Sequence, residues 1–122
     1  MTIPVILLNY NSTDDCRKCI SFLQKQTGVG LEIIVVDNCS VDVNRIAMEQ
    51  LCQEEGCTFI ANARNAGYNA GNNVGLRYAA EKGYEYALIA NPDMEFPQAD
   101  TITNMLSMLG NDEDTADLGT DV

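Results

Sequence analysis

The stretch Ile33-Ile34-Val35-Val36-Asp37 decides the fold of this chain, because four successive apolar residues are followed at once by a carboxylate. Continuous rather than alternating hydrophobicity is typical of a strand buried on both faces, as in a parallel sheet covered by helices. Three more apolar runs end at a carboxamide: residues 5–8 at Asn9, 59–61 at Asn62 and 87–90 at Asn91. Ligands of open parallel sheets bind beyond the carboxyl ends of the strands, so these four polar residues predict a binding edge. The alternative is that Asn and Asp merely end strands and begin turns.

Segments with helical patterns separate these strands. The chain predicts strands at residues 3–8, 32–37, 58–61 and 85–90, and helices at residues 13–26, 43–55, 69–82 and 99–109. This βαβαβαβα alternation predicts an α/β fold in which a mostly parallel sheet is the middle layer of three. Ser12, with Asp15 three residues later, predicts a side-chain cap for the first helix, and Ser40 or Asp42 a cap for the second.

Length and composition indicate a single folded domain. A chain of 122 residues, 46% of them hydrophobic, is long enough to bury a core. No apolar run approaches the length of a membrane span. The N-terminus enters the strand at residues 3–8 without a basic leader or a cleavage site, so we expect no secretion signal and a cytoplasmic location.

The charge is strongly acidic. Seven basic and 18 acidic residues give a net charge of −11, which disfavours nucleic acid as a partner. An anionic ligand would need a compensating charge, and a divalent cation held by carboxylates is the simplest candidate. Five acidic residues and no basic residue lie in the last 13 positions, so residues 110–122 are expected to form a solvated acidic tail.

Five cysteines without a secretion signal argue against a disulfide framework. Cys16 and Cys19 have the spacing of a redox motif, but they share an apolar helical stripe with Ile20 and Leu23, which favours core packing. A zinc site that joins this pair to Cys52 and Cys57 is an alternative, although structural zinc sites usually have tighter spacing.

The turns after the first two strands carry candidate binding residues. Tyr10 stands between Asn9 and Asn11 just before a helix, where an aromatic ring can stack on a planar base. The closely spaced glycines of a dinucleotide fingerprint are missing at this turn, and so are the clustered acids of a phosphoacceptor receiver. Asp37 ends the second strand, where it could accept a hydrogen bond from a base or a ribose hydroxyl.

The third turn, residues 64–75, carries the most candidate binding residues, with Arg64, Asn65 and three regularly spaced glycines. Glycines at 67, 71 and 75 let the backbone approach a ligand or a neighbouring strand. Close packing alone would explain Gly71 and Gly75 but not Arg64 and the asparagines. In the fourth turn, Asn91-Pro92-Asp93, the proline stiffens the chain, and the single carboxylate could complete a Mg²⁺ or Mn²⁺ site with substrate phosphates.

Together these four segments, in unbroken order over roughly residues 3–109, resemble the nucleotide-binding half of the family 2 inverting glycosyltransferases, especially their rhamnosyltransferase-like branch. The resemblance implies a Rossmann-like GT-A domain with strand order 3-2-1-4. It implies that Tyr10 and Asp37 hold the base and that Arg64 and Asn65 help with base or ribose. It also implies that Asp93 reaches the metal that bridges the diphosphate. The full set of nucleotide-binding residues expected from it is Asn9, Tyr10, Asp37, Arg64, Asn65, Gly67 and Asn91.

Two departures from the family pattern bear on the chemistry. The usual acidic D-x-D is Asn91-Pro92-Asp93 here, so its first position contributes no charge to a metal but could bind a ribose hydroxyl or a water. The family also needs an acceptor site and a general base, which we expect beyond Val122, so we predict no catalytic residue within this chain. Residues 1–109 would then be a truncated donor-binding part, and residues 116–119 resemble the start of the family's next strand.

The implied activity is transfer of a sugar from a UDP- or dTDP-sugar to an acceptor hydroxyl, with inversion, in polysaccharide or cell-wall glycan synthesis. The acceptor of the full-length enzyme would be a glycan or a lipid-linked glycan. A nucleotide-binding module without turnover and a flavodoxin-like FMN protein are the alternatives. A homo-oligomer is also possible: one apolar helical stripe near the end could be a contact surface or could pack on the sheet, and it consists of Ile102, Met105, Leu106 and Leu109.

Overall fold

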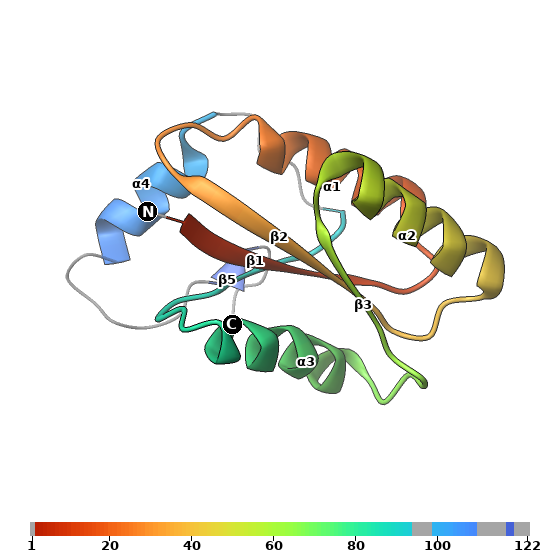
Figure 1. Cartoon of the computed structure of the whole chain (residues 1–122). Helices are drawn as coiled ribbons and strands as arrows, with labels where there is room; N and C mark the ends of the chain where they lie inside the picture. The colour runs from red at the N-terminus through yellow and green to blue at the C-terminus, as the bar shows by residue number, and fades with distance from the viewer. Residues whose placement is uncertain (1, 94–98, 110–116, 119–122) are drawn as a thin grey trace.

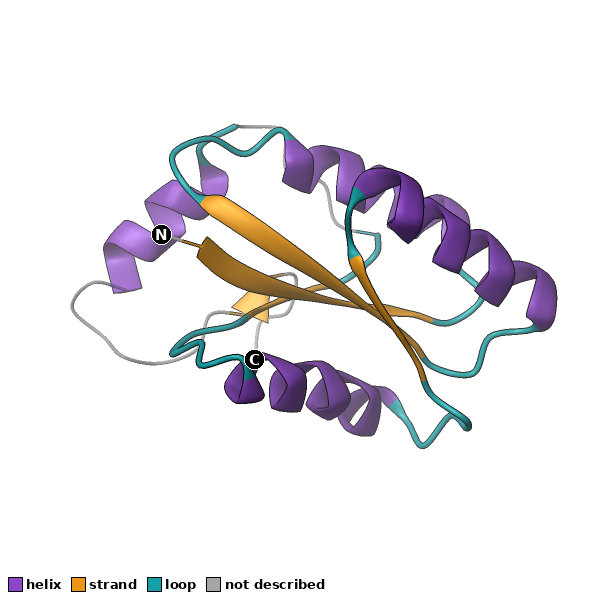
Figure 2. Ribbon diagram, in the orientation of Figure 1, coloured by secondary structure: helices purple, strands orange, loops and turns teal. Residues whose placement is uncertain are grey.

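The computed structural model describes residues 2–93, 99–109 and 117–118. One sheet lies between two layers of helices (Figures 1 and 2). The strands are β1 (Thr2–Asn9), β2 (Gly30–Asp37), β3 (Thr58–Ala61), β4 (Leu88–Ala90) and β5 (Asp117–Leu118). The helices are α1 (Thr13–Gln24), α2 (Asp42–Glu55), α3 (Tyr68–Glu81) and α4 (Thr101–Leu109).

All strands of the sheet are parallel, in the order β3-β2-β1-β4-β5. This confirms the predicted α/β fold and the predicted order 3-2-1-4. β5 adds a short fifth strand beside β4, with Ile89 opposite Asp117 and Ala90 opposite Leu118. The flavodoxin-like order is 2-1-3-4-5, so the observed order excludes the FMN alternative.

Each face of the sheet has its own apolar core, because successive side chains of a strand point to opposite faces. Val5, Leu7 and Val35 lie on the face covered by α1 and α2, in a cluster that also contains Ile102. Ile6 and Ile34 lie on the other face, which α3 covers. All five of these strand side chains and that of Ile102 are wholly buried, which explains why the runs are continuous in the sequence.

The glycines of α3 bring that helix close to the sheet. A Cβ atom at Gly75 would lie 2.6 Å from Cγ2 of Ile6 and 3.2 Å from Cγ2 of Val36. A Cβ atom at Gly71 would lie 2.6 Å from Cδ1 of Leu8. Both glycines are therefore needed for packing, as the close-packing interpretation proposed.

The predicted helix caps are wrong. Ser12 precedes α1, but its side chain makes no capping hydrogen bond and its Oγ donates to the carbonyl oxygen of Tyr10 instead. Val41 precedes α2, and neither Ser40 nor Asp42 caps that helix with its side chain. In both turns the hydroxyl is engaged elsewhere, because contacts across the turns compete with capping.

The apolar stripe near the end of the chain packs inward where it is described. Ile102 is wholly buried and Met105 packs against the same cluster. The side chains of Leu106 and Leu109 lie outside the described residues, and the homo-oligomer stays a prediction. Cys16 and Cys19 are also wholly buried, which confirms their packing role. Over the described residues, no helix combines the length and apolar character needed to cross a membrane.

Candidate functional site

The predicted binding edge exists as a geometric feature. Asn9 is paired in register with Asp37, and Asp37 with Ala61, so β1, β2 and β3 end side by side. Asn62 follows β3 directly, and Asn91 follows β4. The four polar residues that end the apolar runs therefore lie along one edge of the sheet.

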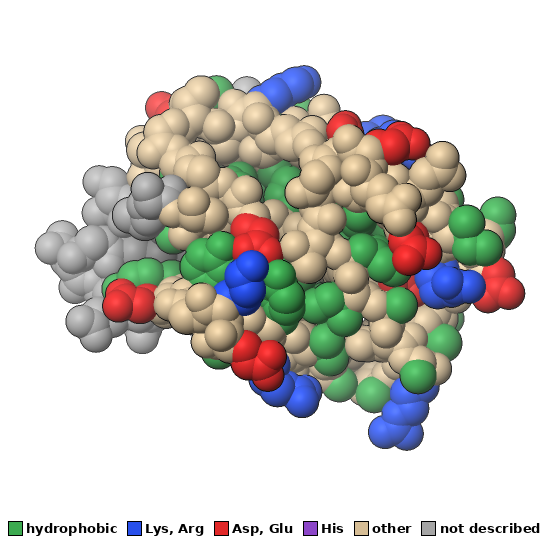
Figure 3. Space-filling view, in the orientation of Figure 1, with side chains coloured by type: hydrophobic (Ala, Val, Ile, Leu, Met, Phe, Trp, Pro, Cys, Tyr) green, Lys and Arg blue, Asp and Glu red, His purple; other side chains and the backbone are tan. Residues whose placement is uncertain are grey.

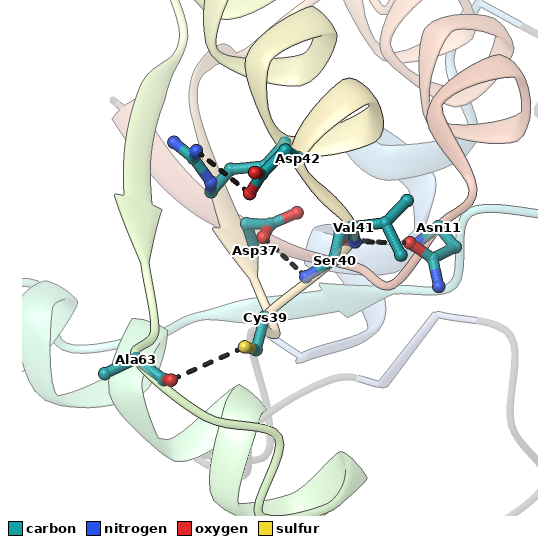
Figure 4. Close-up of polar contacts among 8 residues, drawn as sticks. Asn11, Asp37, Cys39, Ser40, Val41, Asp42 and Ala63 are labelled. Carbon is teal, nitrogen blue, oxygen red and sulfur yellow. Dashed lines mark hydrogen bonds and ion pairs between the residues drawn. The ribbon is translucent and has the colours of Figure 1, made fainter.

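Two of these residues are buried beneath that edge. Asn9 and Asp37 have no exposed surface. The backbone N–H of Ser40 donates to Oδ2 of Asp37 at 3.0 Å (Figure 4). The Nδ2 atom of Asn9 donates to Oδ1 of Asp37 at 2.8 Å. Both carboxylate oxygens are thus occupied by groups of the protein. In this arrangement Asp37 holds the turn after β2 rather than presenting a carboxylate to a ligand.

The turns after β1 and β2 are bonded to each other. The Oδ1 atom of Asn11 accepts from the N–H of Val41 at 2.8 Å, and the N–H of Asn11 donates to Oγ of Ser40 at 2.9 Å (Figure 4). Asn11 and Cys39 have positive φ angles of 53° and 62°. Left-handed backbone at non-glycine residues persists only where surrounding contacts hold it, and it clusters at functional sites.

Asn38 joins β2 to the connection between β3 and α3. It is 3% exposed. Its Nδ2 atom donates to Oδ1 of Asn65 at 2.9 Å and to the carbonyl oxygen of Gly67 at 3.2 Å. Its Oδ1 atom accepts from Nδ2 of Asn62 at 3.2 Å. The N–H of Gly67 also donates to Oδ1 of Asn65, at 2.8 Å, so Asn65 and Gly67 shape the loop that precedes α3.

A cavity of about 330 Å³ opens beside this amide cluster. Its polar lining comes from Asn38, Asn62, Arg64 and Arg77, and its apolar lining includes the first half of α3. Small-molecule sites are typically apolar hollows of this size range with a few polar groups placed to orient the ligand. Gly71 belongs to the lining, so the close approach of α3 to the sheet also forms the floor of the cavity.

Two of the seven basic residues of this acidic chain line that cavity. Both Arg64 and Arg77 are exposed, and in the described part of the chain the ion pairs belong to Arg45 with Asp42 and to Lys82 with Glu32. The two guanidinium groups are therefore free of carboxylates and suited to an anion or to the face of a planar ring. On the face shown in Figure 3, basic and acidic side chains are scattered among each other.

The end of β4 is held by a contact that the sequence did not suggest. The hydroxyl of Tyr68, the first residue of α3, donates to Oδ1 of Asn91 at 2.9 Å. Pro92 follows, and Asp93 is exposed in the turn. Among the residues that the structure describes, no three Asp, Glu, His or Cys side chains gather closely enough to hold a metal ion. The zinc alternative thus finds no support, whereas one exposed carboxylate fits a cation held mainly by substrate phosphates.

A second, open hollow of about 430 Å³ lies at the start of α1 and is lined by Asp14, Asp15 and neutral polar groups. Asn44 closes it from α2, with its Oδ1 atom accepting from Oγ1 of Thr13 at 2.7 Å. Two carboxylates and no basic group make this hollow unsuitable for a phosphate.

The predicted site residues fall into three groups. Asn9, Asp37, Asn65 and Gly67 build the turns. Arg64 lines the cavity. Tyr10, 51% exposed on the turn after β1, does not belong to the cavity lining, and Asn91 and Asp93 lie beyond β4.

Sequence reasoning missed the roles of Asn38, Arg77 and Tyr68. Arg77 follows Ala70 and Val74 at helical spacing, so one face of α3 was a readable signal. Asn38 gave no such signal, because its neighbour Asp37 was the charged and more conspicuous candidate.

Comparison with known proteins agrees with this geometry. The model of Glycosyl transferase family 2 matches residues 5–121. The low-salt glycan biosynthesis hexosyltransferase Agl10 from Haloferax volcanii is 33% identical over 99 residues, which cover 80% of this chain and 30% of that protein.

Two solved structures have the same fold over part of their length. The mannosyltransferase PcManGT from Pyrobaculum calidifontis, in complex with GDP-Man and Mn²⁺, matches with a TM-score of 0.78 and 24% identity over 88% of this chain and 32% of that one. S. aureus TarS in complex with UDP matches with a TM-score of 0.73 and 23% identity over 91% of this chain and 32% of that one. The chain thus spans about a third of the length of these proteins.

Proposed function

Because this chain belongs to glycosyl transferase family 2, we propose that it forms the donor-binding part of an inverting glycosyltransferase. The whole enzyme transfers a sugar from a nucleoside diphosphate sugar to an acceptor hydroxyl in polysaccharide or cell-wall glycan synthesis. The relatives support this substrate class, since one is named for glycan biosynthesis and two structures carry GDP-Man or UDP. A UDP- or dTDP-sugar donor, a glycan or lipid-linked acceptor and the rhamnosyltransferase-like branch belong to the same proposal.

The observation that carries the proposal is the cavity with Arg64 and Arg77. In a chain of net charge −11, two guanidinium groups without carboxylate partners give one hollow a local charge opposite to that of the molecule. Nucleotides combine a planar base with phosphates, and arginine favours both. The cavity is therefore the place on the sheet edge where a nucleotide is favoured in spite of the overall charge.

In this proposal the base of the nucleotide lies in the cavity. The side-chain amide of Asn62, which lines the cavity, offers a donor and an acceptor that match the alternating groups on the edge of a pyrimidine. Its Nδ2 atom now donates to Oδ1 of the buried Asn38 at 3.2 Å, so a base would exchange that bond for its own. Asp37 acts as a positioning residue beneath them, because its carboxylate fixes the turn that carries Asn38.

The diphosphate extends from the cavity toward Asp93. β3 and β4 are three strand spacings apart in the sheet, which is roughly 14 Å and within the span of a nucleoside diphosphate. Asp93 is the residue that would hold a Mg²⁺ or Mn²⁺ ion there, and such an ion, when bound, supplies charge stabilisation for the departing diphosphate. Asn91, whose Oδ1 is held by Tyr68, keeps the preceding turn in place.

Calorimetric titration with UDP, dTDP and GDP, each with Mn²⁺ and with EDTA, tests the donor site. We expect UDP or dTDP to bind and the affinity to be higher with Mn²⁺. Arg64→Met should weaken binding about tenfold under both conditions. Asp93→Asn should remove only the part that depends on Mn²⁺. Arg45→Met is the matched control, because Arg45 is a partly exposed arginine paired with Asp42 outside the cavity.

Absence of binding to every nucleoside diphosphate, with Mn²⁺ present and the protein folded, would sink the donor-site assignment. Equal affinity with Mn²⁺ and EDTA would show that Asn91-Pro92-Asp93 is only a turn. Release of free sugar from a nucleotide sugar would distinguish an enzyme from a module that binds without turnover. The cytoplasmic location is part of the proposal and is supported by five unpaired cysteines.

A further inference from the structure

The end of α2 brings two cysteines together through its backbone. Gly56 follows the helix with φ +72°, in the left-handed region. The N–H of Cys57 then donates to the carbonyl oxygen of Cys52 at 2.9 Å, across the turn. When a helix ends in this way, a side chain from the last helical turn often contacts the side chain of the residue that follows the left-handed glycine. That contact is usually between apolar groups, and here it is between two thiols.

The two thiols flank the same turn but differ in environment. Cys52 is 1% exposed, and the hydrogen bond to Cys57 together with burial raises its pKa. The same hydrogen bond lowers the pKa of Cys57, which is only half-buried. Cys57 is therefore the sulfur that a reagent in solution reaches first and the one that more readily forms a thiolate.

The other three cysteines lack this combination. Cys16 and Cys19 are wholly buried, and burial raises the pKa of Cys19 to about 12. Cys39 is exposed at the turn after β2, where its thiol donates to the carbonyl oxygen of Ala63 at 3.4 Å. A reachable thiol beside a second thiol thus occurs at Cys57 and Cys52.

We propose that Cys52 and Cys57 form a reversible dithiol–disulfide pair, oxidised by small disulfides of the glutathione type. The Cys57 thiolate attacks one sulfur of the small disulfide, forms a mixed disulfide and releases one small thiolate. The Cys52 thiol passes its proton to that thiolate, and the resulting Cys52 thiolate attacks the sulfur of Cys57 and releases the second small thiolate, which takes from solvent the proton that Cys57 gave up on ionising. One small disulfide is reduced to two thiols while two protein thiols are oxidised to one disulfide.

The position of the pair links it to the rest of the molecule. Cys57 immediately precedes β3, and β3 leads to Asn62 in the cavity lining. A disulfide would tie the end of α2 to the start of β3 across a turn that the backbone hydrogen bond already closes. This site is separate from the proposed nucleotide-binding function and does not depend on it.

The sequence allows a direct test by mass spectrometry. No lysine or arginine lies between Arg45 and Arg64, so the tryptic peptide 46–64 contains both Cys52 and Cys57 and no other cysteine. The folded chain is incubated with oxidised glutathione, remaining thiols are alkylated and the protein is digested. We expect peptide 46–64 without alkylation and lighter by two hydrogens than its reduced form, with full reversal by dithiothreitol.

Variants separate the two roles. Cys52→Ala should stop at a stable glutathione adduct on Cys57, whereas Cys57→Ser should leave Cys52 unmodified because it is buried. Cys39→Ser is the matched control and should still form the intrapeptide disulfide. Circular dichroism verifies that each variant is folded. The proposal is overturned if the wild-type chain shows only glutathione adducts, a disulfide between other cysteines, or no reaction.

Discussion

At the scale of single residues, the buried hydrogen bonds of Asp37 control the shape of the candidate site. This carboxylate is wholly buried and accepts from Asn9 and from the backbone of Ser40. Removing one partner from a buried hydrogen bond costs more than the bond contributes, because the partner left behind has lost water as well. The turn that carries Asn38 therefore depends on a residue that itself has no exposed surface.

Asp37→Ala should lower the free energy of unfolding by about 3 kcal/mol, since two buried donors lose their acceptor. Asp42→Ala is the matched control: its side chain is 89% exposed and paired only with Arg45, so its effect should stay within about 0.5 kcal/mol. Urea unfolding followed by circular dichroism measures both. Equal losses for the two variants would contradict the assigned role of Asp37.

At the scale of elements, the distance between α3 and the sheet sets the floor of the cavity. Gly71 and Gly75 face β1 and β2 where a Cβ atom would meet other side chains at 2.6 Å. Helix propensity alone favours alanine over glycine by about 1 kcal/mol. Packing against the sheet must outweigh that preference for the two glycines to be favourable here.

Gly75→Ala should therefore destabilise the protein by about 1–2 kcal/mol, because the methyl of Ile6 is attached to a branched and stiff side chain that cannot turn away. Asn73→Ala, at an exposed position of the same helix, should have the opposite sign and stabilise it by about 0.5 kcal/mol. Thermal unfolding of the two variants makes the comparison. A stabilising Gly75→Ala would mean that α3 can move away from the sheet at little cost.

Glu32 joins several elements at the opposite end of β2. Its carboxylate accepts from Tyr84 at 2.6 Å, from Thr58 at 2.9 Å and from Tyr78 at 3.1 Å, and it pairs with Lys82 at 3.9 Å. Burial raises the pKa of Glu32, but the hydrogen bonds and the lysine outweigh it, so the net pKa is below its usual value. The stabilisation is therefore complete above the unfolded pKa and is lost as pH falls through the folded pKa.

Urea unfolding of wild type and Glu32→Gln at several pH values tests this linkage. The wild type should be more stable at neutral pH, and the difference should shrink as pH falls below about 4.5. Glu85→Gln, which changes an exposed carboxylate that follows Tyr84 in the sequence, serves as the control. A difference that stays constant with pH would show that Glu32 acts by packing alone.

At the scale of the whole molecule, the net charge of −11 acts against compactness. Like charges on the folded surface repel one another, and dissolved salt screens this repulsion over about 10 Å at 0.1 M ionic strength. Two of the basic groups that could offset the repulsion lie in the cavity without acidic partners.

The urea midpoint at neutral pH should therefore rise as potassium chloride is raised from about 0.02 M to about 0.3 M. Binding of a nucleotide should show the reverse, weakening with salt, because the guanidinium groups and the phosphates attract each other. Unfolding and titration at the same salt concentrations measure the two effects in parallel. A midpoint that falls with salt would show that local ion pairs outweigh the net repulsion.

The sequence by itself determined the architecture of this protein and the predicted binding edge of its sheet. Apolar runs and helical patterns are local properties, so the alternation of parallel strands and helices followed from them. The four polar residues that end the runs lie along one edge for the same reason. The order 3-2-1-4, which the structure confirms, was implied by the resemblance to the family. The strand start that the family resemblance placed at residues 116–119 is present as β5, at Asp117–Leu118.

Only the tertiary structure decided which residues of that edge are available to a ligand. Asp37 is buried because Asn9, 28 residues away in the sequence, donates to it. Arg77 reaches the cavity because Gly71 and Gly75 let α3 lie close to the sheet. Cys52 and Cys57 meet because Gly56 takes a left-handed conformation. Burial and contact depend on how distant elements pack, and no local pattern in the chain encodes them.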